Sequence, residues 1–215
     1  WADGKLKEFP EPQIEEYLDH RAHDTFHVSR LTPDDFRDTR QRGVLGMIPG
    51  EIITTDNGYA DHVDLDKDIL KIAVIERHKN THHIGLGYIQ GYGLKSGAVA
   101  TSISHDSHNI IVVGTNSADM AAAANHIVEH HGGIVVMENG EVKGEVVLEI
   151  AGIMSDRPLT EINTELETAK TAAFDLGVSR GIDPFMTLSF MALPVIPKLR
   201  ITTRGVIDVE TQQYV

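Results

Sequence analysis

Cysteine is missing from this 215-residue chain. Its absence excludes a disulfide framework, a thiolate nucleophile and a cysteine-based zinc site. Aromatic residues are scarce as well, at 6%, and tryptophan occurs once, at position 1. Apolar residues nevertheless make up 41% of the chain, which is an ordinary share for a globular protein with a buried core.

Positive charge is also in short supply: 19 Lys and Arg stand against 32 Asp and Glu, and the net charge is −13. Because an acidic chain repels phosphate groups, we expect neither nucleic acid nor a membrane surface as a partner. Long hydrophobic runs are lacking too. The longest, at residues 186–196, is too short and too broken to span a bilayer, and no secretory signal stands near the start. The cytoplasm is therefore the expected compartment.

Residues 1–30 differ from the rest of the chain. They are largely polar, carry Pro10 and Pro12, and contain histidines at positions 20, 23 and 27. Histidines clustered without a structural anchor are a weak metal signal, so we interpret the segment as a linker or the remnant of a preceding β-sandwich domain. Since the first residue is Trp and not Met, we expect further sequence upstream. One compact domain is expected over residues 31–215.

Short β-like runs dominate this domain. The segment 44–55 is interrupted at Pro49-Gly50, which predicts two strands or a kinked one. Asn139-Gly140 is a strong hairpin signal because both residues tolerate positive φ. Further strands are expected at residues 69–76, 84–90, 98–103, 110–114, 134–138 and 145–150.

Two helices are also indicated. Residues 118–131 follow Asn116 as an N-cap and precede the stop Gly132-Gly133. Residues 160–176 carry apolar side chains three and four positions apart, which places them on one helical face, and end before Gly177.

Two shorter elements complete the set, a one-turn helix opened by Thr32-Pro33 and a buried helix or strand at residues 183–193. Strands joined by short turns, with the main helices inserted late, predict an α+β fold. We expect a mainly antiparallel β-sheet with helices packed on it.

A glycine-rich stretch lies between Gly85 and Gly97. Its spacing does not match the dinucleotide-binding fingerprint, and no helix follows it that could hold a phosphate. We therefore predict bulges or close backbone approaches there, and no phosphate site.

The densest group of reactive side chains is Ser104-His105-Asp106-Ser107-His108-Asn109, between two β-like runs. A turn needs only one or two polar residues. Adjacent side chains diverge, so this is not a hydrolytic triad. Three interpretations stay open. The first is a metal site at His105, Asp106 and His108, completed by Glu76 or His78. The second is a polar lid in contact with a substrate, and the third is ordinary turn chemistry with solvated histidines.

Long motifs extend from about residue 28 to the end of the chain. They are VIERH at 74–78, IGLG at 84–87, SHDSHNIIVVGT at 104–115, AGIMSD at 151–156, DPFMTLSF at 183–190 and LPVIP at 193–197. Together they resemble the C-terminal region, roughly the final third, of the bacterial and archaeal adenine deaminases of the amidohydrolase superfamily.

The resemblance implies a metal-dependent hydrolase of purine metabolism that converts adenine and water to hypoxanthine and ammonia. In that family manganese or iron is held by a (β/α)₈ barrel with a His-x-His pair. No such barrel or pair occurs in this sequence, so we expect no cofactor in this chain and no activity from it alone. The implied partners are the upstream barrel domain, adenine and further copies of the chain in a homo-oligomer.

On this resemblance the polar turn caps the mouth of the barrel. We predict His105, Asp106, Ser107 and His108 as catalytic groups, and Asn109 and Glu76 as substrate-binding groups. The alternatives are a structural or oligomerisation module, in which the turn takes no part, and a small independent metal-binding protein.

Overall fold

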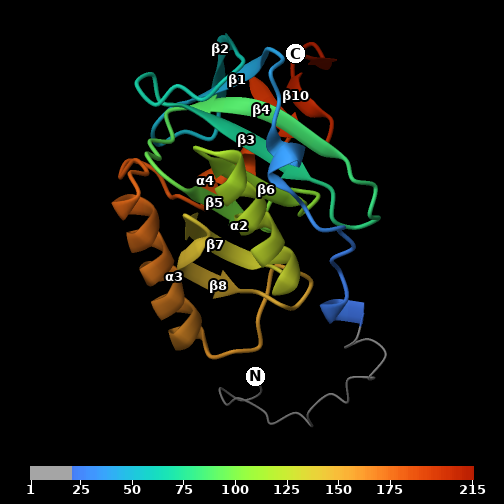
Figure 1. Ribbon diagram of the computed structural model, residues 1–215, viewed down its shortest axis with the longest axis vertical. Helices are drawn as coiled ribbons and strands as arrows, with labels where there is room; N and C mark the ends of the chain where they lie inside the picture. Colours follow the sequence, from blue (N-terminus) through green and yellow to red (C-terminus); the bar gives the residue numbers. More distant parts are fainter. Residues whose placement is uncertain (1–20) are drawn as a thin grey trace, which may run out of the picture.

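A large β-sheet forms the centre of the computed structural model, which describes residues 21–215 (Figure 1). Its eight strands lie in the order β2-β1-β4-β3-β6-β5-β7-β8. Neighbouring strands are antiparallel except β1 and β4, which are parallel. The expected fold class is confirmed. The strands are β1 (Arg42–Met47), β2 (Thr54–Ala60), β3 (Ile69–Ile75), β4 (Ile84–Gln90), β5 (Ala98–Thr101), β6 (Ile110–Gly114), β7 (Gly133–Glu138) and β8 (Glu141–Val147).

The central strands are buried on both faces because nearly all of their side chains are apolar. Every residue of β5 and β6 is buried. Successive side chains of a strand point to opposite faces, so Ile111 and Val113 enter one hydrophobic core while Ile110 and Val112 enter a second. An antiparallel sheet with such continuous apolar strands must be covered on both sides.

Helices and a small second sheet supply this cover. The core that contains Ile111 also includes residues of α3 (Leu159–Asp175), α4 (Met186–Met191), β9 (Leu199–Thr202) and β10 (Gly205–Asp208). The other core lies beneath α2 (Ser117–Glu129) and the 3-10 helix η1 (Pro33–Phe36). Strand β11 (Gln213–Tyr214) pairs with β10 and completes the small sheet.

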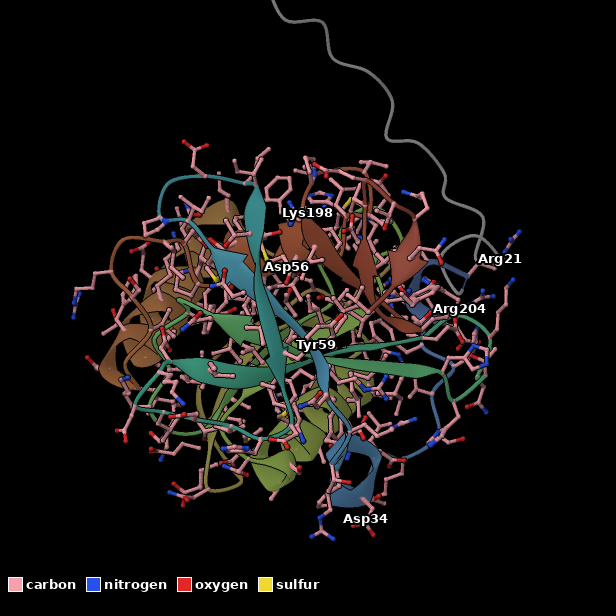
Figure 2. All side chains as sticks on the ribbon, turned by 90° about the horizontal axis from the view of Figure 1, so that it is seen from above. Arg21, Asp34, Asp56, Tyr59, Lys198 and Arg204 are labelled. Atoms are coloured by element: carbon pink, nitrogen blue, oxygen red, sulfur yellow. The ribbon has the colours of Figure 1, made fainter. Side chains whose placement is uncertain are left out.

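The edge strand β2 is polar by contrast. All of its residues after Thr54 are exposed or half-buried, and Figure 2 shows Tyr59 and Asp56 at the outer surface of the sheet. Polar side chains on an edge discourage pairing with other chains.

The local sequence signals are largely confirmed. Strands β1 and β2 are separated around Pro49-Gly50, and Asn139-Gly140 joins β7 to β8. The Asn116 Oδ1 atom accepts a hydrogen bond from the Asp119 N–H at 2.8 Å and caps α2. Residues 183–193 contain the short helix α4 and no strand. The expected strand at 145–150 instead begins at Glu141, because the tight turn pairs Glu138 directly with Glu141.

The glycine-rich stretch allows close packing, as predicted. At Gly85 of β4, a Cβ atom would lie 1.9 Å from the Thr202 carbonyl oxygen. Only glycine therefore lets the turn between β9 and β10 lie against the large sheet.

The described part of the first segment packs on the domain. Phe26 is buried in the second core, and the His27 N–H donates a hydrogen bond to the Arg77 carbonyl oxygen at 2.8 Å. The domain boundary at residue 30 stays a prediction, and residues 1–20, with His20, lie outside the described part of the chain. None of the helices formed by residues 21–215 has the length and hydropathy needed to cross a bilayer.

Candidate functional site around the 104–109 turn

Residues 104–109, called the polar turn below, connect β5 to β6 in the middle of the large sheet. Two fully buried strands therefore fix both of its ends. Ser104 and Asn109 are buried, His105 and His108 are half-buried, and Asp106 and Ser107 are exposed. The Ser104 hydroxyl is buried and has no hydrogen-bond partner among the described residues.

Arg77 anchors the polar turn from the end of β3. Its Nε atom donates to the His108 carbonyl oxygen, while Nη1 and Nη2 donate to the carbonyl oxygens of Thr25 and Ala151, both at 2.9 Å. The guanidinium also lies 4.2 Å from the centroid of the Phe26 ring. Burial lowers the pKa of Arg77 to about 10, so the side chain remains charged at neutral pH. One cation thus ties two distant segments to the polar turn.

Both imidazoles of the polar turn contact protein. The His105 ring centroid lies 5.0 Å from that of Phe190. The backbone N–H of His105 donates to the Ser189 carbonyl oxygen at 3.0 Å and holds the ring in this position. The Ser104 N–H donates to His108 Nδ1 at 3.4 Å. Burial lowers the pKa of His108, and the neighbouring His105 and Arg77 lower it further. His108 is therefore a neutral ring at neutral pH.

A cavity of about 340 Å³ opens beside the polar turn, lined by Asp106, Ser107 and Asn109. Its other walls are Val74 of β3, residues 192–195 after α4, and residues 201–203 at the β9–β10 turn. This volume is within the range of small-molecule sites, roughly 300–1,000 Å³. The cavity combines apolar walls with one carboxylate, one amide and the hydroxyls of Ser107, Thr202 and Thr203, a combination that suits a small heterocycle.

Asn109 holds this part of the turn in shape. Its Oδ1 atom accepts from the Arg77 N–H at 3.2 Å, and its Nδ2 donates to Ser107 Oγ at 3.0 Å. The His78 Nε2 atom, from the loop after β3, lies 2.7 Å from the Ser107 carbonyl oxygen.

Glu76 lies just after β3, and its carboxylate bonds within the loop that follows the strand. Its carboxylate accepts hydrogen bonds from the N–H groups of His78 at 2.6 Å and Lys79 at 3.0 Å, and from the Thr81 hydroxyl at 2.9 Å. Desolvation raises the pKa of Glu76, but these hydrogen bonds outweigh it and the net pKa is lowered. Glu76 thus stabilises the loop 76–83 by hydrogen bonds within it. Of Glu76 and His78, only His78 contacts the polar turn through its side chain. The substrate-binding role of Glu76 stays a prediction.

The metal interpretation of the polar turn finds no support in the geometry. Within residues 21–215, one group of three possible ligands brings its atoms within 4.8 Å of one another, and it consists of His126, His130 and Glu145. His105, Asp106 and His108 are therefore not arranged as a ligand set.

Sequence reasoning missed the importance of Arg77. An arginine at a strand end is usually solvated, and its carbonyl partners at Thr25 and Ala151 are 52 and 74 residues away. The available signal was its position between the buried run 69–75 and the polar loop, inside one of the long motifs.

Comparison with known proteins identifies the family. Residues 50–213 match the model of the adenine deaminase C-terminal domain. "Adenine deaminase 2" of Carboxydothermus hydrogenoformans is 41% identical over 98% of this chain and 39% of its own length. "Adenine deaminase" of Brucella anthropi is 45% identical over 87% of this chain and 35% of its own length. "Adenine deaminase 1" of Rhizobium meliloti is 46% identical over 79% of this chain and 31% of its own length. The chain thus spans about a third of the length of these relatives. It belongs to the adenine deaminase C-terminal domain family.

Proposed function

We propose that this chain forms the C-terminal part of an adenine deaminase, which hydrolyses adenine to hypoxanthine and ammonia, and that its polar turn caps the active site of an upstream barrel domain. One observation carries the proposal. Asp106 and Ser107 are exposed and line a cavity whose lining also includes residues of the 193–197 motif. The names of the relatives support the reaction.

The reaction requires a nucleophile for C6 of the purine, a proton for the leaving ammonia and hydrogen-bond partners for the ring nitrogens. Manganese or iron held by the upstream barrel domain would supply the nucleophile, because a divalent metal lowers the pKa of water. In this proposal Asp106 accepts a hydrogen bond from a purine N–H, and the Ser107 hydroxyl donates one to a ring nitrogen; the exposure of both side chains at the cavity supports these roles. His105 and His108 stay predicted catalytic groups, and each would have to leave its packed position to reach the substrate.

Exposed apolar side chains around α4 support a covering domain. Ile52 and Met186, which are 49% and 45% exposed, line a second cavity of about 370 Å³. Val195, 70% exposed, lines the cavity at the polar turn. Because large apolar side chains exposed together mark interaction sites, the cavity lined by Ile52 and Met186 suits contact with the upstream domain. The same observation favours the second candidate, a module that joins copies of the chain in a homo-oligomer.

A chimaera tests the proposal. The 215 residues replace the matching region of the Carboxydothermus hydrogenoformans relative, and ammonia release from adenine is measured. We expect turnover from the chimaera and none from the chain alone. Asp106→Asn and Ser107→Ala should each lower kcat/KM by about 10-fold or more, which is the value of one lost hydrogen bond of about 1.4 kcal/mol.

Asp66→Asn, in an exposed loop before β3, is the matched control and should retain full activity. Unchanged kinetics in both cavity variants, with normal metal content, would remove the polar turn from the active site. If Val195→Glu then dissociates an oligomer without changing the kinetics per subunit, the second candidate is correct.

A further inference from the structure

Three side chains outside the polar turn have the arrangement of a cation site. His126 and His130 lie four residues apart near the C-terminal end of α2, so they share one face of the helix. Glu145 lies on the edge strand β8 and pairs with Val135, a member of the core beneath α2. The carboxylate therefore lies on the sheet face that α2 covers, and one ligand atom from each of the three residues is within 4.8 Å of the others.

The contacts within this cluster prepare the imidazoles for a metal. His126 Nε2 lies 2.6 Å from Glu145 Oε2, and the two imidazole rings stack with centroids 4.0 Å apart. The His130 Nδ1 atom lies 2.9 Å from the His126 carbonyl oxygen. Since a carbonyl oxygen can only accept, Nδ1 of His130 carries the proton and the lone pair on Nε2 is free. Ligating histidines are commonly held by such a hydrogen bond from their second nitrogen.

The surroundings also favour a cation. The His126 side chain is 17% exposed and that of Glu145 is 39% exposed, so the cluster is partly desolvated yet open to solvent. The carbonyl groups at the C-terminal end of a helix carry partial negative charge, and both histidines are close to that end of α2. Two imidazoles and one carboxylate form a ligand set typical of Zn²⁺ and similar transition-metal ions.

We propose that His126, His130 and Glu145 bind one divalent transition-metal cation of the Zn²⁺ class and thereby link α2 to the edge strand β8. The cation takes the place of the proton shared by His126 and Glu145, and that proton is released to solvent. Metal–ligand bonds of about 2.0–2.2 Å require ligand atoms on the order of 3 Å apart. His126 Nε2 and Glu145 Oε2, now 2.6 Å apart, would therefore separate slightly, while wider separations among the three ligand atoms, which are up to 4.8 Å, would close. The proposal does not rest on the function proposed above.

Zinc binding to the metal-stripped 215-residue chain tests this site. Calorimetry with Zn²⁺ alone should show one equivalent bound, and Co²⁺ in its place should give a visible absorption spectrum of a nitrogen- and oxygen-ligated ion. His130→Ala and Glu145→Gln should each weaken Zn²⁺ binding by at least about 10-fold. Glu145→Gln removes the carboxylate but keeps a hydrogen-bond partner for His126. A loss of Zn²⁺ affinity in this variant is therefore due to the lost ligand and not to misfolding.

His83→Ala is the control, because His83 is an exposed histidine of the loop 76–83 and should leave Zn²⁺ binding unchanged. Thermal unfolding without metal checks that all three variants fold. Less than one equivalent of bound Zn²⁺, or binding of wild-type strength in either His130→Ala or Glu145→Gln, would overturn the proposal.

Discussion

Replacement of Arg77 by Met removes the cation that joins the polar turn to its neighbours while retaining an apolar side chain of similar length. Arg77 is 2% exposed and donates to the carbonyl oxygens of His108, Thr25 and Ala151. All three oxygens lose a charged donor in the variant. We therefore expect the loss to appear as reduced stability and as loosening of the polar turn.

The size of the effect follows from two opposing terms. A hydrogen bond from a charged donor contributes about 1.5–3 kcal/mol, so three of them contribute roughly 4.5–9 kcal/mol. The desolvation that lowers the pKa of Arg77 to about 10 opposes this gain. Its cost is about 3 kcal/mol, since each pKa unit corresponds to about 1.4 kcal/mol. The net destabilisation by Arg77→Met should therefore be roughly 1.5–6 kcal/mol.

Urea denaturation of the 215-residue chain at neutral pH measures this difference in unfolding free energy. Arg77→Lys should give an intermediate loss, because one ammonium group cannot reach three separate carbonyl oxygens. The control is Arg204→Met in the exposed β9–β10 turn (Figure 2), which should change stability by less than about 0.5 kcal/mol. A loss below about 1 kcal/mol for Arg77→Met would refute the reasoning, since the burial cost would then cancel the hydrogen bonds.

Two further substitutions test the packing around the polar turn. Because burial lowers the pKa of His108, the unfolded chain takes up a proton before the folded chain as pH falls, and stability should be lost as the pH drops below about 6.5. The variant is His108→Asn, since asparagine tolerates the positive φ of 49° at this position. It should flatten the plot of unfolding free energy against pH between about pH 7 and pH 5. An unchanged slope would contradict the lowered pKa of His108. Gly85→Ala should lower the unfolding free energy by about 1–3 kcal/mol, because its Cβ atom would lie 1.9 Å from the Thr202 carbonyl oxygen. Gly181→Ala, whose Cβ atom would approach nothing closer than 3.7 Å, is the comparison, and equal stability of the two variants would contradict the close approach.

Local sequence patterns predicted the secondary structure correctly where the conformation depends on residues that are neighbours in the chain. The strands at 84–90 and 110–114 were predicted with their observed bounds, because each is a short apolar run bordered by polar or glycine residues. The N-cap at Asn116 and the turn at Asn139-Gly140 were also predicted from the sequence and are present in the structure. The parallel pairing of β1 with β4 and the small sheet β9-β10-β11 were not predicted, since those contacts depend on packing between separate segments.

The sequence by itself also indicated the candidate site, because a turn needs only one or two polar residues and residues 104–109 are all polar. Only the tertiary structure decided which of them are available: Asp106 and Ser107 line a cavity, while His105 packs on Phe190. It likewise joined Arg77 to the polar turn and brought Glu145 to His126. A residue's own neighbours fix its local conformation, but a site is made by side chains that meet across distant parts of the chain, and only packing brings those together.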